Sequence, residues 1–134
     1  GDDAEARVTA LLDFSMPRIV AFEATFKAAL RLSLEQWARG QAGALGSEPP
    51  FERGHRKALL QEAIAPLRRK LSKPRFARLA QALSLVYGLE LLVVLKDMWG
   101  LSAQEMQDVA IWAARALVRS AVAEAEDDAI TVSA

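Results

Sequence analysis

Apolar residues recur at spacings of three and four along most of this chain, which is the period of an amphipathic α-helix. Prolines and glycines mark the expected breaks: Pro17 at the start of one helix, Pro66 as a kink or a split near Ala65, and Gly100 between the last two helices. No segment alternates between apolar and polar residues as a half-buried strand does. We therefore predict an all-α fold, a helical bundle of about five to six helices. The expected helices cover residues 2–14, 17–39, 52–71, 74–98 and 102–124.

The last third of the chain contains the most apolar helix. From Ala82 to Leu95, apolar side chains occur on nearly every side, and a helix of this kind must be buried on all sides. The next helix begins with a capping box, Ser102 with Glu105, and carries a stripe of alanines that lets a neighbouring helix approach closely. We expect these two helices to pair with those of a second copy as a four-helix dimer interface, although packing within one subunit uses the same pattern. The expected interface residues are Leu85, Gly88, Leu92, Leu95, Ala110, Ala113, Ala114, Leu117 and Ala121.

Length and composition limit the classes of function. The chain has 134 residues, enough for one domain over residues 1–125, followed by a tail at 126–134 that we expect to be disordered. It contains no cysteine and one histidine, and no paired carboxylates occur on an inward helix face. The sequence therefore predicts no catalytic residue, no metal site, no cofactor and no enzyme. The longest apolar run, interrupted by Ser84 and Glu90, is shorter than the roughly 20 residues that cross a bilayer, so we expect a cytoplasmic protein without membrane contact.

The formal net charge is zero, but the charges are unevenly distributed. Between Arg53 and Arg78 Glu62 is the only acidic residue among many basic ones. Such a block is typical either of contact with nucleic acid or an anionic ligand, or of a solvated face that balances an acidic one. We favour the solvated face, because only one aromatic residue, Phe76, lies in the block to stack on a base. The segment around His55 has the same two interpretations, an anion or pH-sensing site or a helix start on the surface.

Three segments resemble the C-terminal domain of TetR-family transcriptional regulators. They are FKAALRLSLEQW (residues 26–37), RGHRKALLQEAIAPLRRKL (residues 53–71) and LVYGLELLVVLKDMWGLSAQEMQDVAIWAARALV (residues 85–118). The resemblance implies the ligand-sensing and dimerisation domain of a transcriptional repressor, a homodimer that binds a small apolar or amphipathic effector. Members of the family begin with a three-helix DNA-binding domain, and nothing like it precedes Gly1. We therefore expect this chain to reach DNA only through a domain that it does not contain.

The resemblance also implies an effector pocket between the helices of each subunit, lined by apolar side chains and a few polar ones. The same residues at the same spacing are equally typical of an ordinary core, in which case the chain is a purely structural helical homodimerisation module without a ligand. Glu90 stands alone in the apolar run and needs a partner, which is either the effector or a group such as Arg31, Trp112 or a basic side chain across the dimer. The expected ligand-binding residues are Phe14, Met16, Phe22, Phe26, Leu30, Trp37, Tyr87 and Glu90.

Overall fold

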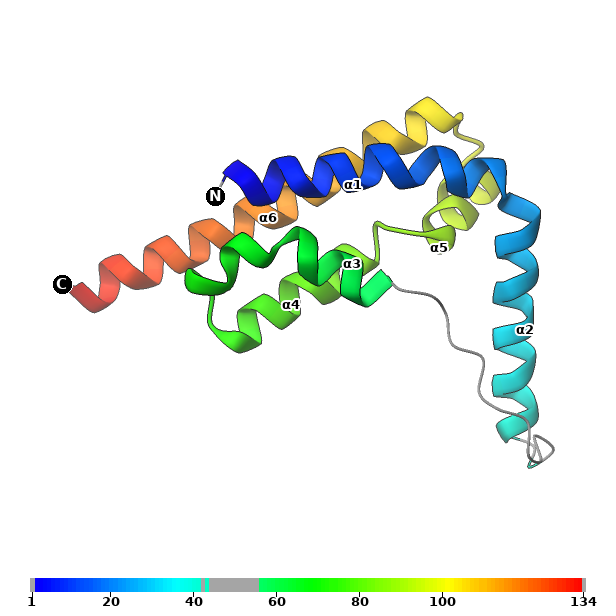
Figure 1. Ribbon diagram of the computed structural model, residues 1–134, viewed down its shortest axis with the longest axis horizontal. Coiled ribbons are helices and arrows are strands. Elements are labelled where there is room, and N and C mark those ends of the chain that lie inside the picture. Colours follow the sequence, from blue (N-terminus) through cyan, green and yellow to red (C-terminus); the bar gives the residue numbers. More distant parts are fainter. Residues whose placement is uncertain (1, 42, 44–55, 134) are drawn as a thin grey trace.

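The computed structural model describes residues 2–41, 43 and 56–133, and within them the fold is an all-α helical bundle (Figure 1). The prediction of an all-α bundle is confirmed. Most of the loop predicted after Gly40, together with Arg53, Gly54 and His55, lies outside the described residues. The elements are α1 (Asp2–Ala21), α2 (Glu23–Gln41), α3 (Arg56–Ala63), η1 (Ala65–Arg69), α4 (Lys73–Ser84), α5 (Leu89–Leu92), η2 (Val93–Met98) and α6 (Ala103–Ser133).

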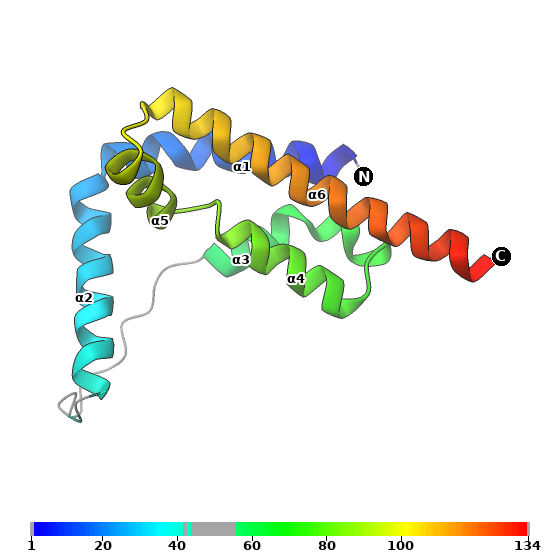
Figure 2. The same cartoon turned by 180° about the vertical axis from the view of Figure 1, so that it is seen from behind.

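The centre of the bundle is the antiparallel pair of α1 and α6, which lie side by side along the long axis (Figures 1 and 2). On α1, Val8 and Leu12 are buried, and they share one core cluster with Ala110 and Ala114 of α6. Alanines one turn apart leave room for the backbone of the facing helix to approach. The segments α3, η1 and α4 complete this core with large aliphatic side chains, among them Leu60, Ile64, Leu67 and Leu83.

The first helix is longer than the sequence predicted. Helix α1 continues through Pro17 to Ala21, although an end or kink was expected there. Met16, just before Pro17, and Ile19, two residues after it, are both buried in the core. This burial keeps the backbone helical although proline cannot donate a backbone hydrogen bond. Ser15, expected to cap a new helix, is instead a buried residue inside α1.

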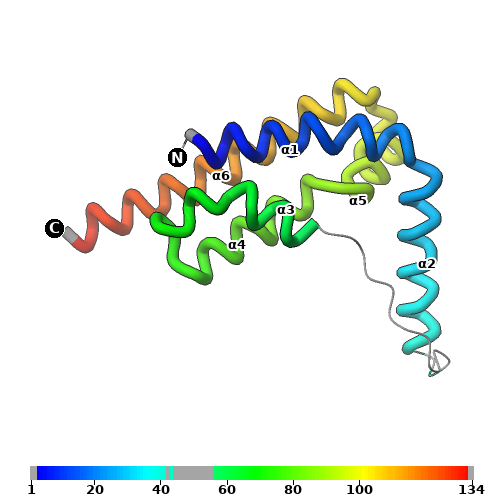
Figure 3. The backbone as a smooth tube through the Cα atoms, viewed as in Figure 1, coloured from blue at the N-terminus to red at the C-terminus, as the bar shows by residue number. Residues whose placement is uncertain are grey.

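Helix α2 leaves the bundle at Phe22, where the chain bends sharply (Figure 3). Backbone hydrogen bonds from Phe22 to Arg18 and from Phe26 to Phe22, both 3.0 Å, cross the bend. Beyond it α2 projects to one side and contacts chiefly α1 and α5. No residue of α2 is buried. This helix is therefore attached to the bundle mainly at its first turns.

The helix predicted over residues 74–98 is interrupted. Helix α4 ends at Ser84, and the next helix, α5, begins at Leu89. The non-helical segment between them contains Gly88 at φ +103°. Backbone at this φ is accessible to glycine and rarely to other residues, so Gly88 permits the break that hydrophobic periodicity alone does not reveal. The split of the preceding helix at Pro66 is confirmed, because α3 ends at Ala63 and η1 follows.

The last helix begins as predicted and ends later. The Ser102 hydroxyl accepts from the Glu105 amide at 3.2 Å and the Glu105 carboxylate accepts from the Ser102 amide at 3.0 Å, which confirms the capping box. The expected end near Glu124 is wrong, since α6 extends to Ser133. Ion pairs from α4 reach its last turns, at Glu124 and Asp128, and they hold this exposed segment beside the bundle.

Most residues predicted for the dimer interface lie inside the subunit. Ala110, Ala114 and Ala121 are buried in the core built on α1, and Leu92 is buried in a second cluster with Met106. Gly88 is buried as well, while Leu95, Ala113 and Leu117 are partly buried. Only Leu85 is well exposed, at 77%. The assignment of the buried alanines to a partner is wrong, because the small-residue stripe serves the close contact between α1 and α6.

Candidate functional site

Helix α2 carries a broad apolar face that the other residues described by the structure leave uncovered. Phe22, Phe26, Leu30, Leu34 and Trp37 follow one another at spacings of three and four, so they share one side of the helix. Leu30 is partly buried against the second core cluster, whereas Leu34 and Trp37 are 57% and 68% exposed. A 19-residue helix with such a face and no buried residue is unusual in a folded domain. The face is available to a ligand or a partner.

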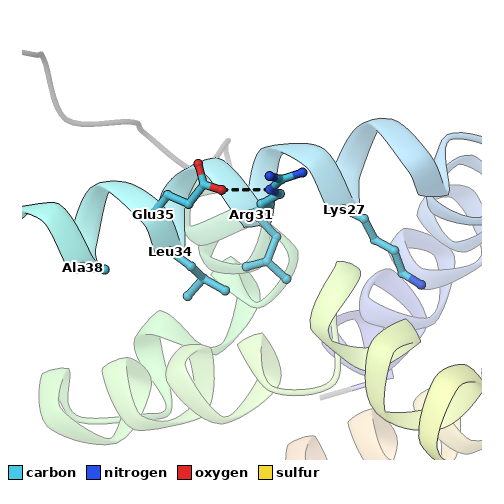
Figure 4. A pocket seen from close by; sticks show the side chains of 6 residues that line it. Lys27, Arg31, Leu34, Glu35 and Ala38 are labelled. Carbon is cyan, nitrogen blue, oxygen red and sulfur yellow. Dashed lines mark hydrogen bonds and ion pairs between the residues drawn. The ribbon is translucent and has the colours of Figure 1, made fainter.

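One side of α2 lines an open hollow of about 390 Å³. Its walls combine the aliphatic groups of Leu30, Leu34 and Ala38 with charged side chains, which are those of Lys27, Arg31 and Glu35. In Figure 4, Leu34 and Lys27 extend from α2 toward the side on which α3, α4 and α5 lie. The Arg31 Nε donates to Glu35 Oε1 at 2.8 Å along the rim. This mixture of aliphatic and charged groups suits an amphipathic molecule, although all six lining residues belong to α2, so the hollow contacts such a molecule from one side.

The first turn of α2 is fastened to η2 by alternating charges. Glu23 accepts from Lys27, at 2.8 Å, and from Lys96. Lys27 in turn donates to Asp97 at 2.6 Å. We call this series, Lys96–Glu23–Lys27–Asp97, the charged clasp. Two consecutive residues of η2 thus meet two residues one turn apart on α2, and together they set the direction in which α2 leaves the bundle.

The charged clasp shifts the protonation of its members. Hydrogen bonds from Lys27 and then Lys96 hold the pKa of the Glu23 carboxyl below its ordinary value of 4.5. The hydrogen bond to Asp97, followed by that to Glu23, raises the pKa of Lys27 above its ordinary value of 10.5. Both shifts favour the charged forms. Glu23 and Lys27 are consequently both charged at neutral pH.

A second ion pair closes the break between α4 and α5. Arg56 Nη2 donates to Glu90 Oε2 at 2.5 Å, and its Nη1 lies 3.4 Å from the Ser84 carbonyl oxygen. The guanidinium passes directly over Gly88, where a Cβ atom would lie 2.6 Å from Nη2. Glu90 therefore has a structural partner in its own chain, a residue other than those suggested from sequence. The sequence gives no sign of this contact, because it joins residues 34 positions apart across a break that was not predicted.

The structure does not bring the eight predicted ligand-binding residues into one pocket. Met16 is buried in the main core, and the Tyr87 hydroxyl lies 3.1 Å from the buried Ser15 hydroxyl. Phe14 is exposed on α1 beneath the guanidinium of Arg18, whose Cζ is 4.5 Å from the ring centroid. Of the eight only Leu30 lines the hollow, while Phe22, Phe26 and Trp37 extend the apolar face of α2. Lys27 and Leu34 were missed, although their spacing from Leu30 and Arg31 along one helix could have revealed them.

A second uncovered apolar surface lies on α6, opposite the alanine stripe. Val109, Trp112 and Ala116 follow at spacings of three and four, and all three are exposed. Trp112 is 74% exposed, and Met98 and Trp99 are exposed at the turn that leads into α6. We call Val109, Trp112 and Ala116 the outer stripe of α6. Asp108 and Arg115, each one turn from Trp112, are also exposed on this side, so the outer stripe is a narrow apolar line beside charged side chains.

The comparisons with known proteins leave the family open: no family model, no curated protein and no solved structure matches this chain. Within the described part of the chain, no three His, Asp or Glu side chains gather where they could hold a metal ion. In that same part no single helix has the length and apolar character needed to cross a bilayer. The two uncovered apolar surfaces are accordingly the features from which a function can be argued.

Proposed function

We propose that this chain is the ligand-sensing and dimerisation domain of a TetR-like transcriptional regulator. The observation that carries the proposal is the uncovered apolar face of α2 beside an open hollow, whereas the other described helices bury their apolar faces in the core clusters. A small apolar or amphipathic molecule in the hollow covers Leu30 and Leu34 and places a polar group near Lys27 or Arg31. Binding then adds contacts for a helix that has few of its own.

The dimer in this proposal forms through the outer stripe of α6. The buried alanine stripe is already used within the subunit, so the exposed side with Trp112 is the one left for a second copy. An isologous contact places each Trp112 against the partner copy and removes it from water. Helix α6 thus provides the interface by the side opposite its alanine stripe.

The coupling between ligand and DNA affinity follows from helix α1. Its 20 residues form one continuous helix, about 30 Å long at 1.5 Å per residue, that ends at the bend into α2. A ligand that binds one placement of α2 more tightly than another shifts the population of that placement. The continuous α1 transmits the shift to its N-terminal end, ahead of which the family's DNA-binding domain is attached. The coupling needs a difference in ligand affinity between the two placements.

The alternative is a structural dimerisation module without a ligand. The observation in its favour is that Met16 and Tyr87, both predicted to line a pocket, are used inside the subunit. The two functions differ in one respect, which is whether any small molecule stabilises the folded chain through the hollow.

A thermal-shift screen with apolar and amphipathic compounds separates them. A ligand at about 100 times its dissociation constant stabilises the native state by roughly 2.7 kcal/mol, so a true ligand raises the melting temperature clearly. Leu34→Glu places a carboxylate in the hollow and should abolish the shift. Leu32→Glu is the matched control, since Leu32 is also exposed on α2 but does not line the hollow. Equal shifts in both variants, or no shift with any compound, would refute the sensing function.

A further inference from the structure

The turn from η1 into α4 exposes basic side chains that have no acidic partner. Arg69, Lys70 and Lys73 are exposed and form no ion pair with any residue that the structure describes. Arg68 is also exposed, and its guanidinium carbon lies 4.3 Å from the centroid of the Phe76 ring rather than beside a carboxylate. We call these residues, Arg68, Arg69, Lys70 and Lys73, the basic turn.

The neighbouring cations differ from the basic turn because they are neutralised. Arg75 pairs with Asp128 and Arg78 pairs with Glu124, so the acidic end of α6 covers the side of α4 that faces it. Glu124 and Asp128 are one helical turn apart and share that side. Glu126 and Asp127, rotated away from that line by the helical spacing, form no ion pair with a described residue.

Several cations elsewhere on the described surface also have partners, whereas Arg18 and Lys57 form no ion pair with a described residue. Arg7 pairs with Glu62, and Arg115 and Arg119 both pair with Glu5. The basic region that looked uniform along the sequence is therefore divided by the fold. One part forms intramolecular ion pairs, and the other leaves four cations within six residues facing solvent.

The basic turn lies at the same end of the molecule as the start of α1. Both views of the ribbon place the N-terminus and the turn between η1 and α4 toward the same end of the molecule, beyond which the last turns of α6 project (Figures 1 and 2). The contacts agree, since Arg7 Nε donates to the Ala63 carbonyl at 3.1 Å and Ala4 shares the core cluster with Leu67 of η1. A domain attached ahead of α1 is therefore closest to this end.

We propose that the basic turn contacts the phosphodiester backbone of duplex DNA. The inference rests on the proposed function, in which a DNA-binding domain precedes α1 and brings the duplex to this end. Lysine and arginine side chains bind phosphates without reading sequence, and the exposed turn presents no aromatic side chain for a base to stack on. The contact adds affinity and salt dependence, and it leaves the choice of sequence to the attached domain.

The test measures binding of the 134-residue chain to a short fluorescently labelled duplex of arbitrary sequence by anisotropy, across a series of salt concentrations. We expect weak binding at low salt, with log K falling against log salt at a slope of about −0.9 per phosphate contacted, or about −3.6 for four contacts. The combined variant Arg68→Gln, Arg69→Gln, Lys70→Gln and Lys73→Gln should bind at least about tenfold more weakly and with a much shallower slope.

A matched control removes the same charge elsewhere. The variant Arg18→Gln, Lys57→Gln, Arg115→Gln and Arg119→Gln also lowers the net charge by four, with all four residues outside both the basic turn and the hollow. It should retain most of the affinity and the slope. Circular dichroism of both variants checks that the helices are intact, and any comparison is made only at temperatures where both are folded.

Three results would overturn the proposal. They are no duplex binding at low salt, equal weakening in the two variants, and binding to vesicles of phosphatidylglycerol and phosphatidylcholine without binding to DNA, which would assign the basic turn to a membrane surface instead. Failure here is distinguishable from failure of the sensing function, because the compound screen and the dimer measurement involve no DNA.

Discussion

Helices α1 and α2 are nearly equal in length, with 20 and 19 residues, and both carry an apolar face, yet they are held in opposite ways. Helix α1 buries Val8, Leu12, Met16 and Ile19 in the core. Helix α2 buries no residue and is fastened at its base by the charged clasp. The same kind of sequence pattern thus produces a fixed helix in one case and an uncovered one in the other.

The energetic difference between the two helices is large. Each fully buried aliphatic side chain contributes about 1.5–3 kcal/mol, whereas an exposed ion pair contributes at most about 1 kcal/mol. Helix α2 therefore belongs to the least stable part of the domain, from which elements that move on ligand binding are drawn. The comparison teaches that an apolar face need not mark a core, and that its partner has to be sought outside the helix.

The largest effect is expected when a buried leucine of α1 is truncated, in contrast to an exposed leucine of α2. Leu12→Ala leaves a cavity between α1 and α6 and should lower the free energy of unfolding by about 2–5 kcal/mol. Leu34→Ala on α2 should change it by less than about 0.5 kcal/mol, because Leu34 is 57% exposed. Urea denaturation of both variants measures this contrast. Similar losses would show that α2 is packed as firmly as α1.

The break beside α5 is the next site to test. Gly88→Ala introduces a Cβ at φ +103° and 2.6 Å from Arg56 Nη2, so it should cost about 1–3 kcal/mol. Gly100→Ala is the control, since Gly100 also has a positive φ, +71°, but nothing within 4 Å of the new Cβ. Gly88, at φ +103° and ψ −166°, lies in a region that only glycine populates readily, so the larger loss at Gly88 combines backbone strain with the contact to Arg56. Equal shifts would mean that neither the strain nor the contact adds to the cost of a side chain at Gly88.

The smallest effect concerns the charged clasp and pH. Because its pKa is lowered in the folded state, Glu23 adds stability that is present above about pH 4.5 and is lost as the pH falls below that value. Lys27 has a raised pKa, so its contribution is lost only as the pH rises beyond 10.5. Melting curves of Glu23→Gln should therefore depend less on acidic pH than those of the unmodified chain. Parallel pH profiles would contradict a role for the clasp.

The sequence predicted the features that depend on local pattern. The helical class, the break at Pro66 and the capping box at Ser102 are confirmed, because each follows from residues close together in the chain. The break at Gly88 was missed, since a lone glycine in an apolar run signals it only weakly. For the same reason the partner of Glu90 was missed, because Arg56 is brought to it by the tertiary fold.

The candidate site was predicted less well than the fold. Hydrophobic periodicity identifies an apolar face, but it does not say whether the face meets its own chain, a second copy or a ligand. The alanines of α6 were therefore assigned to a dimer partner, whereas they pack against α1 of the same subunit. The outer stripe around Trp112 was not predicted. On α2 the face was recognised, but its exposure depends on the bend at Phe22, which no local signal marks.

The central claim is that α6 joins two copies while α2 remains available to a ligand, and sedimentation of two tryptophan variants tests it most directly. Trp112 and Trp37 are similarly exposed, at 74% and 68%, one on each helix. A dilution series should show the unmodified chain and Trp37→Glu as dimers at concentrations where Trp112→Glu is a folded monomer, because a buried interface tryptophan is a typical hot spot. A monomeric unmodified chain, or dissociation by Trp37→Glu and not by Trp112→Glu, would contradict the claim.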